Sequence, residues 1–130
     1  LEAHEVQLAT TSVLTTINGP TKLTPAGTGT ITGATYQFSP TNTLLPFISS
    51  GNQTLTSTPT ILTAGVPFGQ LVLLYNAGTP GTGHLKLTRG TAEQLQLSNS
   101  TSQIDEGGSM LLMFDGTNWV EIAHTQGTTT

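Results

Sequence analysis

The sequence predicts an all-β domain, an antiparallel β-sandwich or jelly-roll-like fold, for three reasons. Its apolar residues gather into short runs of strand length rather than into a helical stripe. Turn residues, among them 15 Gly and 7 Pro, separate these runs at roughly 8–12-residue spacing. Thr, a β-branched residue that favours strands, is abundant throughout. A hydrophobic fraction of 35% indicates that this composition folds rather than stays disordered.

The N-terminal half carries the weaker strand signals. Residues 5–17 have loosely helical apolar spacing, but the Thr residues among them argue against a helix. We expect the run 44–48 to form only an edge strand or a loop, because it contains Pro46 and proline cannot donate a ladder hydrogen bond. The other short pieces expected here are 21–24, 28–38, 53–57 and 60–63.

The C-terminal half predicts clearer strands. They are expected at 70–76, 84–88, 94–98, 109–114 and 119–124. The last two flank Asp115-Gly116-Thr117-Asn118, and an Asp-Gly pair between apolar runs is a strong hairpin signal. We therefore expect an antiparallel hairpin with a positive φ at Gly116, and with Ala123 on the same face as Trp119.

Two of these strands, 70–76 and 109–114, are apolar on both alternating faces. In a small antiparallel domain only one face of a strand meets its own core, so the other face needs a second cover. We expect that cover to be another subunit, which predicts a homo-oligomer, most simply a trimer. The alternative is that the Thr-rich N-terminal segment caps the two strands. The expected interface positions are Val72, Leu74, Leu111, Met113 and Trp119.

Trp119 is the single Trp, and it allows two interpretations. An exposed indole beside polar side chains would form a platform for a sugar. The apolar residues of its strand instead favour packing in the core or at an interface.

Four segments of the region 53–124 carry a resemblance to a known group of proteins. The most specific is the run Met110–Glu121, with its Asp-Gly-Thr-Asn turn and Trp-Val-Glu return; the others are 54–61, 69–76 and 95–99. Together they resemble modules of tailed-phage virion surface proteins, namely fibre, head-fibre and appendage proteins, which are usually homotrimers. The resemblance brings no catalytic residue with it.

The resemblance implies a structural component of a virus particle: a fibre, a knob or a capsid decoration. It places the chain at the virion surface, in an extracellular setting, with copies of itself and other virion proteins as partners. Its outer loops would be available for attachment to a host surface glycan or receptor. The alternative function, from a different class, is a cellular carbohydrate-binding or adhesin module that acts as a monomer.

The composition excludes nucleic-acid binding, a membrane-spanning segment and any chemistry that needs a thiol. The chain has three Lys and Arg against seven Asp and Glu, and only 8% of its residues are charged. Three cations cannot form the basic stripe that a nucleic acid requires. No apolar run approaches the roughly 20 residues of a membrane span. The absence of Cys excludes disulfides, zinc-thiolate sites and thiol catalysis.

The remaining candidate chemical groups predict neither an enzyme nor a metal or cofactor site. His4, His84 and His124 lack the spacing of a metal site. Asp105 and Glu106 are adjacent, so on a strand they would point to opposite faces; their place before two glycines favours a loop. Asp115 is explained by its turn and lacks a calcium-loop pattern. There is no G-x-S-x-G elbow, and the short run 27–29 lacks the rest of a phosphate loop.

The organisation expected along the chain is one β-rich domain at 21–125, with a connecting segment at 1–20 and a frayed tail at 126–130. The first residue is not Met, which indicates the cut end of a longer chain or a cloning remnant.

Overall fold

The computed structural model describes residues 18–20 and 22–127, and in this part the chain is all-β. No helix occurs among these residues, so none is available to span a membrane. The strands are β1 (Gly29–Ile31), β2 (Leu44–Ser49), β3 (Gln53–Thr54), β4 (Leu71–Asn76), β5 (Leu85–Thr88), β6 (Leu95–Gln96), β7 (Thr101–Ile104), β8 (Ser109–Phe114) and β9 (Trp119–Thr125). The run 5–17 lies outside the described residues.

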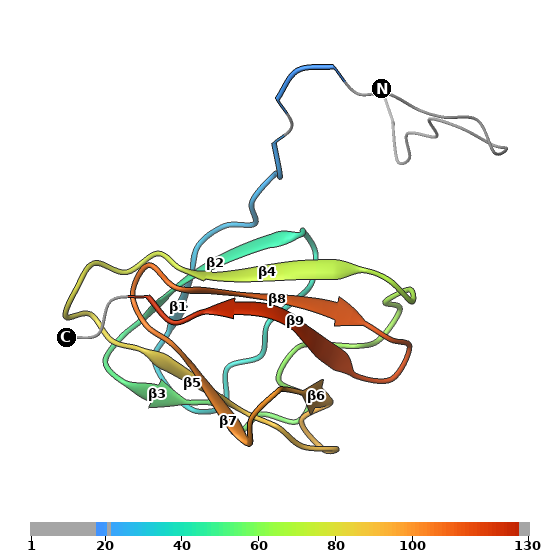
Figure 1. Cartoon of the computed structure of the whole chain (residues 1–130). Helices are drawn as coiled ribbons and strands as arrows, with labels where there is room; N and C mark the ends of the chain where they lie inside the picture. Colours follow the sequence, from blue (N-terminus) through green and yellow to red (C-terminus); the bar gives the residue numbers. More distant parts are fainter. Residues whose placement is uncertain (1–17, 21, 128–130) are drawn as a thin grey trace, which may run out of the picture.

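The strands form two sheets that lie over one another (Figure 1). The larger has six strands in the order β1-β2-β4-β8-β9-β6, and the smaller has three in the order β3-β5-β7. Four of the seven strand pairings are parallel: β1 with β2, β2 with β4, β3 with β5, and β6 with β9. The expectation of an antiparallel fold was therefore wrong for these pairs. Turn signals reveal hairpins between consecutive strands, but they carry no information about the long crossovers that parallel pairs require.

One hydrophobic core fills the space between the sheets. The buried face of the six-stranded sheet includes Val72, Leu74, Met110, Leu112 and Trp119, and the three-stranded sheet contributes Leu85, Leu87 and Ile104. In β4, β5 and β8 the buried residues alternate with more exposed ones, as the two-residue period of a strand requires.

The run around Pro46 is an interior strand, which corrects the expectation of an edge strand or loop. β2 lies between β1 and β4. On the β1 side, Ala26 N–H donates to Leu44 O, and the pairing with β1 begins only at Phe47. Pro46 therefore falls in the gap between these contacts, where its missing N–H removes no ladder hydrogen bond.

The predicted hairpin is confirmed. β8 and β9 pair antiparallel from Phe114 opposite Trp119 to Ser109 opposite Thr125, and Gly116 has a φ of 96°. A register shift between Leu111 and Leu112 inserts one extra residue into β9. Ala123 consequently lies opposite Leu111, so the expectation that Ala123 shares a face with Trp119 was wrong. Periodicity alone cannot locate a bulge of this kind.

Several of the weaker strand predictions also change. Residues 22–24 form no strand, and of the run 28–38 only β1 and an isolated bridge at Phe38 remain. β7 was not predicted, because Ile104 is its only apolar residue. Its second inward residue is Ser102, whose hydroxyl lies within hydrogen-bond distance of the Glu121 carboxylate (3.4 Å). At the C-terminal end, Gln126 O accepts a hydrogen bond from Asp105 N–H at 2.6 Å.

Candidate functional site

The face of the six-stranded sheet that points away from the core is apolar across four adjacent strands. Strand register aligns its side chains in rows, because paired residues share a face of the sheet. One row runs across Leu44, Leu73, Leu111 and Ala123. We define the outer face as these four residues together with Pro46, Ile48, Leu71, Tyr75, Met113, Val120 and Ile122.

The outer face is partly exposed and carries no charge. Leu71 is 42% exposed, Tyr75 40% and Ile122 54%. None of its residues is Asp, Glu, Lys or Arg. Phe68, in the loop before β4, is 73% exposed and adjoins the β8–β9 turn at Gly116. A contiguous exposed apolar surface that extends over several strands is typical of an interaction site.

The residues expected at an interface divide between the two faces of this sheet. Leu111 and Met113 belong to the outer face. Val72, Leu74 and Trp119 are fully buried in the chain's own core. These three side chains are thus unavailable to a partner, and the surface that could bind one is formed by their neighbours.

The residues that the sequence analysis missed are chiefly Leu71, Leu73 and Tyr75 of β4. Alternation correctly separates them from Val72 and Leu74, but β4 is apolar on both sides, so the pattern does not say which set turns inward. Burial in the structure resolves the question. Val72 and its partner Leu112 are buried, whereas Leu71 and its partner Met113 lie on the outer face.

Trp119 is a core residue rather than a sugar platform. It is 0% exposed, its ring centroid lies 5.1 Å from that of Phe114, and its Nε1–H donates to Leu62 O at 3.4 Å. An indole enclosed in this way offers no open face to a ligand.

Asp105 and Glu106 are both buried directly after β7, where they organise a junction rather than an open loop. Glu106 Oε1 accepts hydrogen bonds from Gly81 N–H at 3.0 Å and from Gly83 N–H at 2.9 Å. Hydrogen bonds from its own backbone N–H and from those of Gly83 and Gly81 hold the pKa of Glu106 below its ordinary value, against the opposing effect of burial. Asp105 Oδ1 accepts from Gln103 Nε2 at 2.6 Å. These contacts tie the turn after β4 to the β7–β8 connection.

Asp115 acts within its turn. Its Oδ1 accepts hydrogen bonds from Asn118 N–H at 2.7 Å and from Thr117 N–H at 2.9 Å, and these contacts lower the pKa of the Asp115 carboxyl. This is the side-chain-to-backbone bonding by which Asp stabilises a tight turn.

The histidines are dispersed. His84 Nδ1 lies 4.0 Å from Asp105 Oδ1, and His124 Nε2 lies 2.7 Å from Gln103 O. His4 lies outside the described residues. Within residues 18–20 and 22–127, no three His, Asp or Glu side chains gather as potential metal ligands.

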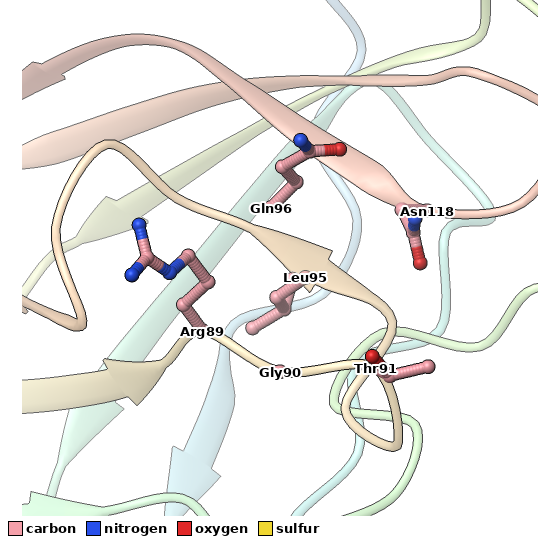
Figure 2. Close-up of a pocket in the computed structure, with 6 residues that line it drawn as sticks. All are labelled: Arg89, Gly90, Thr91, Leu95, Gln96 and Asn118. Carbon is pink, nitrogen blue, oxygen red and sulfur yellow. The ribbon is translucent and has the colours of Figure 1, made fainter.

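A small polar pocket lies at the β6 edge of the six-stranded sheet (Figure 2). Its volume is about 350 Å³, and its lining residues are Arg89, Gly90, Thr91, Leu95, Gln96 and Asn118. Gln96 pairs in register with Val120, so this pocket borders the outer face. A second hollow, of about 270 Å³, lies beside Tyr36 and Phe38 at the opposite end of the sheet order.

Comparison with known proteins identifies no relative. No protein-family model matches the sequence, and neither a curated protein nor a solved structure matches it. The function is therefore inferred from the residues and the geometry of the chain itself.

Proposed function

We propose that the chain is a structural β-module that assembles with copies of itself through the outer face of its six-stranded sheet. The observation that carries this proposal is the uncharged apolar surface formed by β2, β4, β8 and β9. Burying one Leu side chain is worth about 1.5–3 kcal/mol, and the outer face presents four Leu beside Met113, Val120 and Ile122. Contact with a second copy would remove this surface from water.

A trimer is the assembly we propose. A three-fold axis allows the same face of each chain to point inward toward a shared apolar centre. The modules that the C-terminal half resembles are usually homotrimers, which supports this number. The two sheets packed over one core, in the manner of a sandwich, leave the three-stranded sheet on the outside of such a trimer.

We further propose that the module belongs to a virus particle, as a fibre, knob or capsid decoration with other virion proteins as partners. The support is the resemblance of the C-terminal half, together with a composition in which only 8% of all residues are charged. Isolated soluble domains usually carry more charge, so this composition suits a chain whose surface is partly covered by neighbours. We propose no catalytic role and no metal or cofactor.

Single-cysteine cross-linking tests the use of the outer face, because the chain has no Cys of its own. Tyr75→Cys places a thiol on the outer face, and Thr88→Cys places the matched control on the outer side of β5. A short bismaleimide should link copies of the Tyr75 variant at micromolar concentration and leave the Thr88 variant as single chains. Equal cross-linking of both variants would show that assembly does not use the outer face. Failure of both to cross-link, in a chain that sediments as a monomer, would favour the monomeric carbohydrate-binding or adhesin module.

A further inference from the structure

We propose that the pocket at the β6 edge binds a sugar that carries a carboxylate, such as a uronic acid. The recognising groups are the Arg89 guanidinium, the Gln96 and Asn118 carboxamides and the Thr91 hydroxyl (Figure 2). This inference goes beyond the proposed assembly, because it concerns a small ligand at the β6 edge, which borders the outer face.

The polar side chains of the pocket have no partner among the residues that the structure describes. The Arg89 guanidinium forms no ion pair there, and the Gln96 and Asn118 carboxamides form no hydrogen bond. Most other amide side chains are engaged: those of Gln70, Gln94 and Gln103, for example, bond to Pro40 O, Thr117 O and Asp105 Oδ1. Arg89, Thr91 and Gln96 are exposed around one hollow, where their donors and acceptors are accessible to a polar ligand.

The backbone that carries these side chains is held in place. Arg89 N–H donates to Ser100 O at 2.9 Å, and Leu95 and Gly90 exchange backbone hydrogen bonds at 3.1 and 3.2 Å. Asn118 N–H donates to Asp115 Oδ1 at 2.7 Å. The backbone around the pocket is therefore fixed before a ligand binds, which lowers the conformational entropy that the chain loses on binding.

The charge of the pocket selects a carboxylate. Arg89 is one of only three Lys and Arg residues in the chain, and its planar guanidinium can donate two parallel hydrogen bonds to a carboxylate. The Glu93 carboxylate lies so close to Gly90 that a side chain at position 90 would collide with it. This neighbouring negative charge disfavours a doubly charged phosphate more than a singly charged carboxylate.

The size and lining of the pocket select a sugar scaffold. A volume of about 350 Å³ is at the lower end for small-molecule sites, which suits one or two sugar rings. Leu95 is only 2% exposed, and Trp119 is fully buried, so neither an apolar ligand nor stacking on this indole is supported. Two carboxamides and a hydroxyl, which both donate and accept, match the hydroxyl groups of a sugar.

An NMR titration of the full chain tests this proposal with sodium glucuronate, glucose and sodium acetate as probes. We expect glucuronate to shift the amide signals of residues 89–91, 95–96 and 118, with an affinity at least about tenfold higher than that of glucose or acetate. Glucose binding as tightly would overturn the role of the carboxylate, and acetate binding as tightly would overturn the role of the sugar. Absence of any shift with glucuronate would overturn the whole proposal.

Matched variants assign the binding to Arg89. Arg89→Gln should weaken glucuronate binding by about tenfold or more while the melting temperature stays unchanged, because the guanidinium forms no ion pair in the described residues. Lys86→Gln, which removes a nearby cation on β5 outside the pocket, should keep the affinity. An equal loss in both variants would indicate attraction by net charge alone and would contradict the site. The titration reports on the pocket whatever the mass of the particle, so its failure is distinguishable from a failure of assembly.

Discussion

The two sheets share one core but differ on the faces that they turn away from it. On the three-stranded sheet, the residues between the buried positions of β5 and β7 are Lys86, Thr88, Thr101 and Gln103. On β4 and β8 the corresponding positions are Leu71, Leu73, Tyr75, Ser109, Leu111 and Met113. The polar side chains of the first face can form hydrogen bonds with water, so that face needs no cover. The second is apolar and uncharged, so covering it with another apolar surface would be favourable.

The largest effect should come from the core side of the three-stranded sheet. Leu87 is fully buried, whereas its neighbour Thr88 lies on the outer side of the same strand. Leu87→Ala should lower the free energy of unfolding by about 2–5 kcal/mol, because it leaves a cavity between the sheets. Thr88→Ala should change it by less than about 0.5 kcal/mol. Urea denaturation of both variants checks this, and equal effects would contradict the assignment of faces.

On the six-stranded sheet the outer residues should affect assembly. Leu73→Thr and Leu111→Thr introduce a β-branched side chain that suits a strand but remove apolar surface from the outer face. Each should raise the dissociation constant of the oligomer roughly tenfold or more. Lys86→Thr, the same new residue on the other sheet, should leave it unchanged. Sedimentation at several concentrations measures these constants, and an oligomer insensitive to both Leu substitutions would place the contact elsewhere.

The β8–β9 hairpin supplies two of the four strands of the outer face, and its turn should tolerate substitution poorly at one position. Gly116 has a φ of 96°, a conformation strained for a residue with a Cβ. Gly116→Val should lower the free energy of unfolding by about 1 kcal/mol or more. Thr117→Val, at an exposed position where only the backbone N–H and C=O form hydrogen bonds in the described residues, should be nearly neutral. Thermal melts of the two variants check this, and an unchanged melting temperature for Gly116→Val would count against the turn.

The smallest effect concerns pH and the junction at Glu106. Its carboxylate is stabilised by backbone N–H groups, so its folded pKa lies below the ordinary value of 4.5. A lowered pKa means that this stabilisation is complete above pH 4.5 and is lost as the pH falls through the folded pKa. Glu106→Gln should therefore flatten the decrease in stability between neutral pH and acid. Glu93→Gln, which leaves the Gly81 and Gly83 contacts in place, should retain it; identical acid profiles for Glu106→Gln and the unmodified chain would contradict this account.

The sequence predicted best where a strand has one polar side. In β5, the alternation of Leu85 and Leu87 with Lys86 and Thr88 predicts both the strand and its inward face, and the structure agrees. In β4 the same reasoning yields the strand but not its orientation. The Asp115–Asn118 turn predicts its hairpin because all the information is local.

The features that the sequence could not predict depend on distant segments. The parallel pair of β2 and β4 joins residues that are separated by a strand of the other sheet. The pocket likewise unites Arg89 after β5, Gln96 on β6 and Asn118 before β9, and no spacing rule connects these positions. The buried Glu106 carboxylate is bonded by backbone N–H groups of a glycine-rich turn more than 20 residues earlier in the chain, a contact that strand periodicity cannot predict.

The most direct test of the central claim is the mass of the unmodified chain in solution, measured by sedimentation equilibrium from micromolar concentration upward. The proposed assembly through the outer face predicts a species of three times the chain mass of 13.5 kDa, which dissociates on combining Leu73→Thr with Leu111→Thr. A single-chain mass at every concentration would contradict the claim, because the outer face would then remain without a second copy.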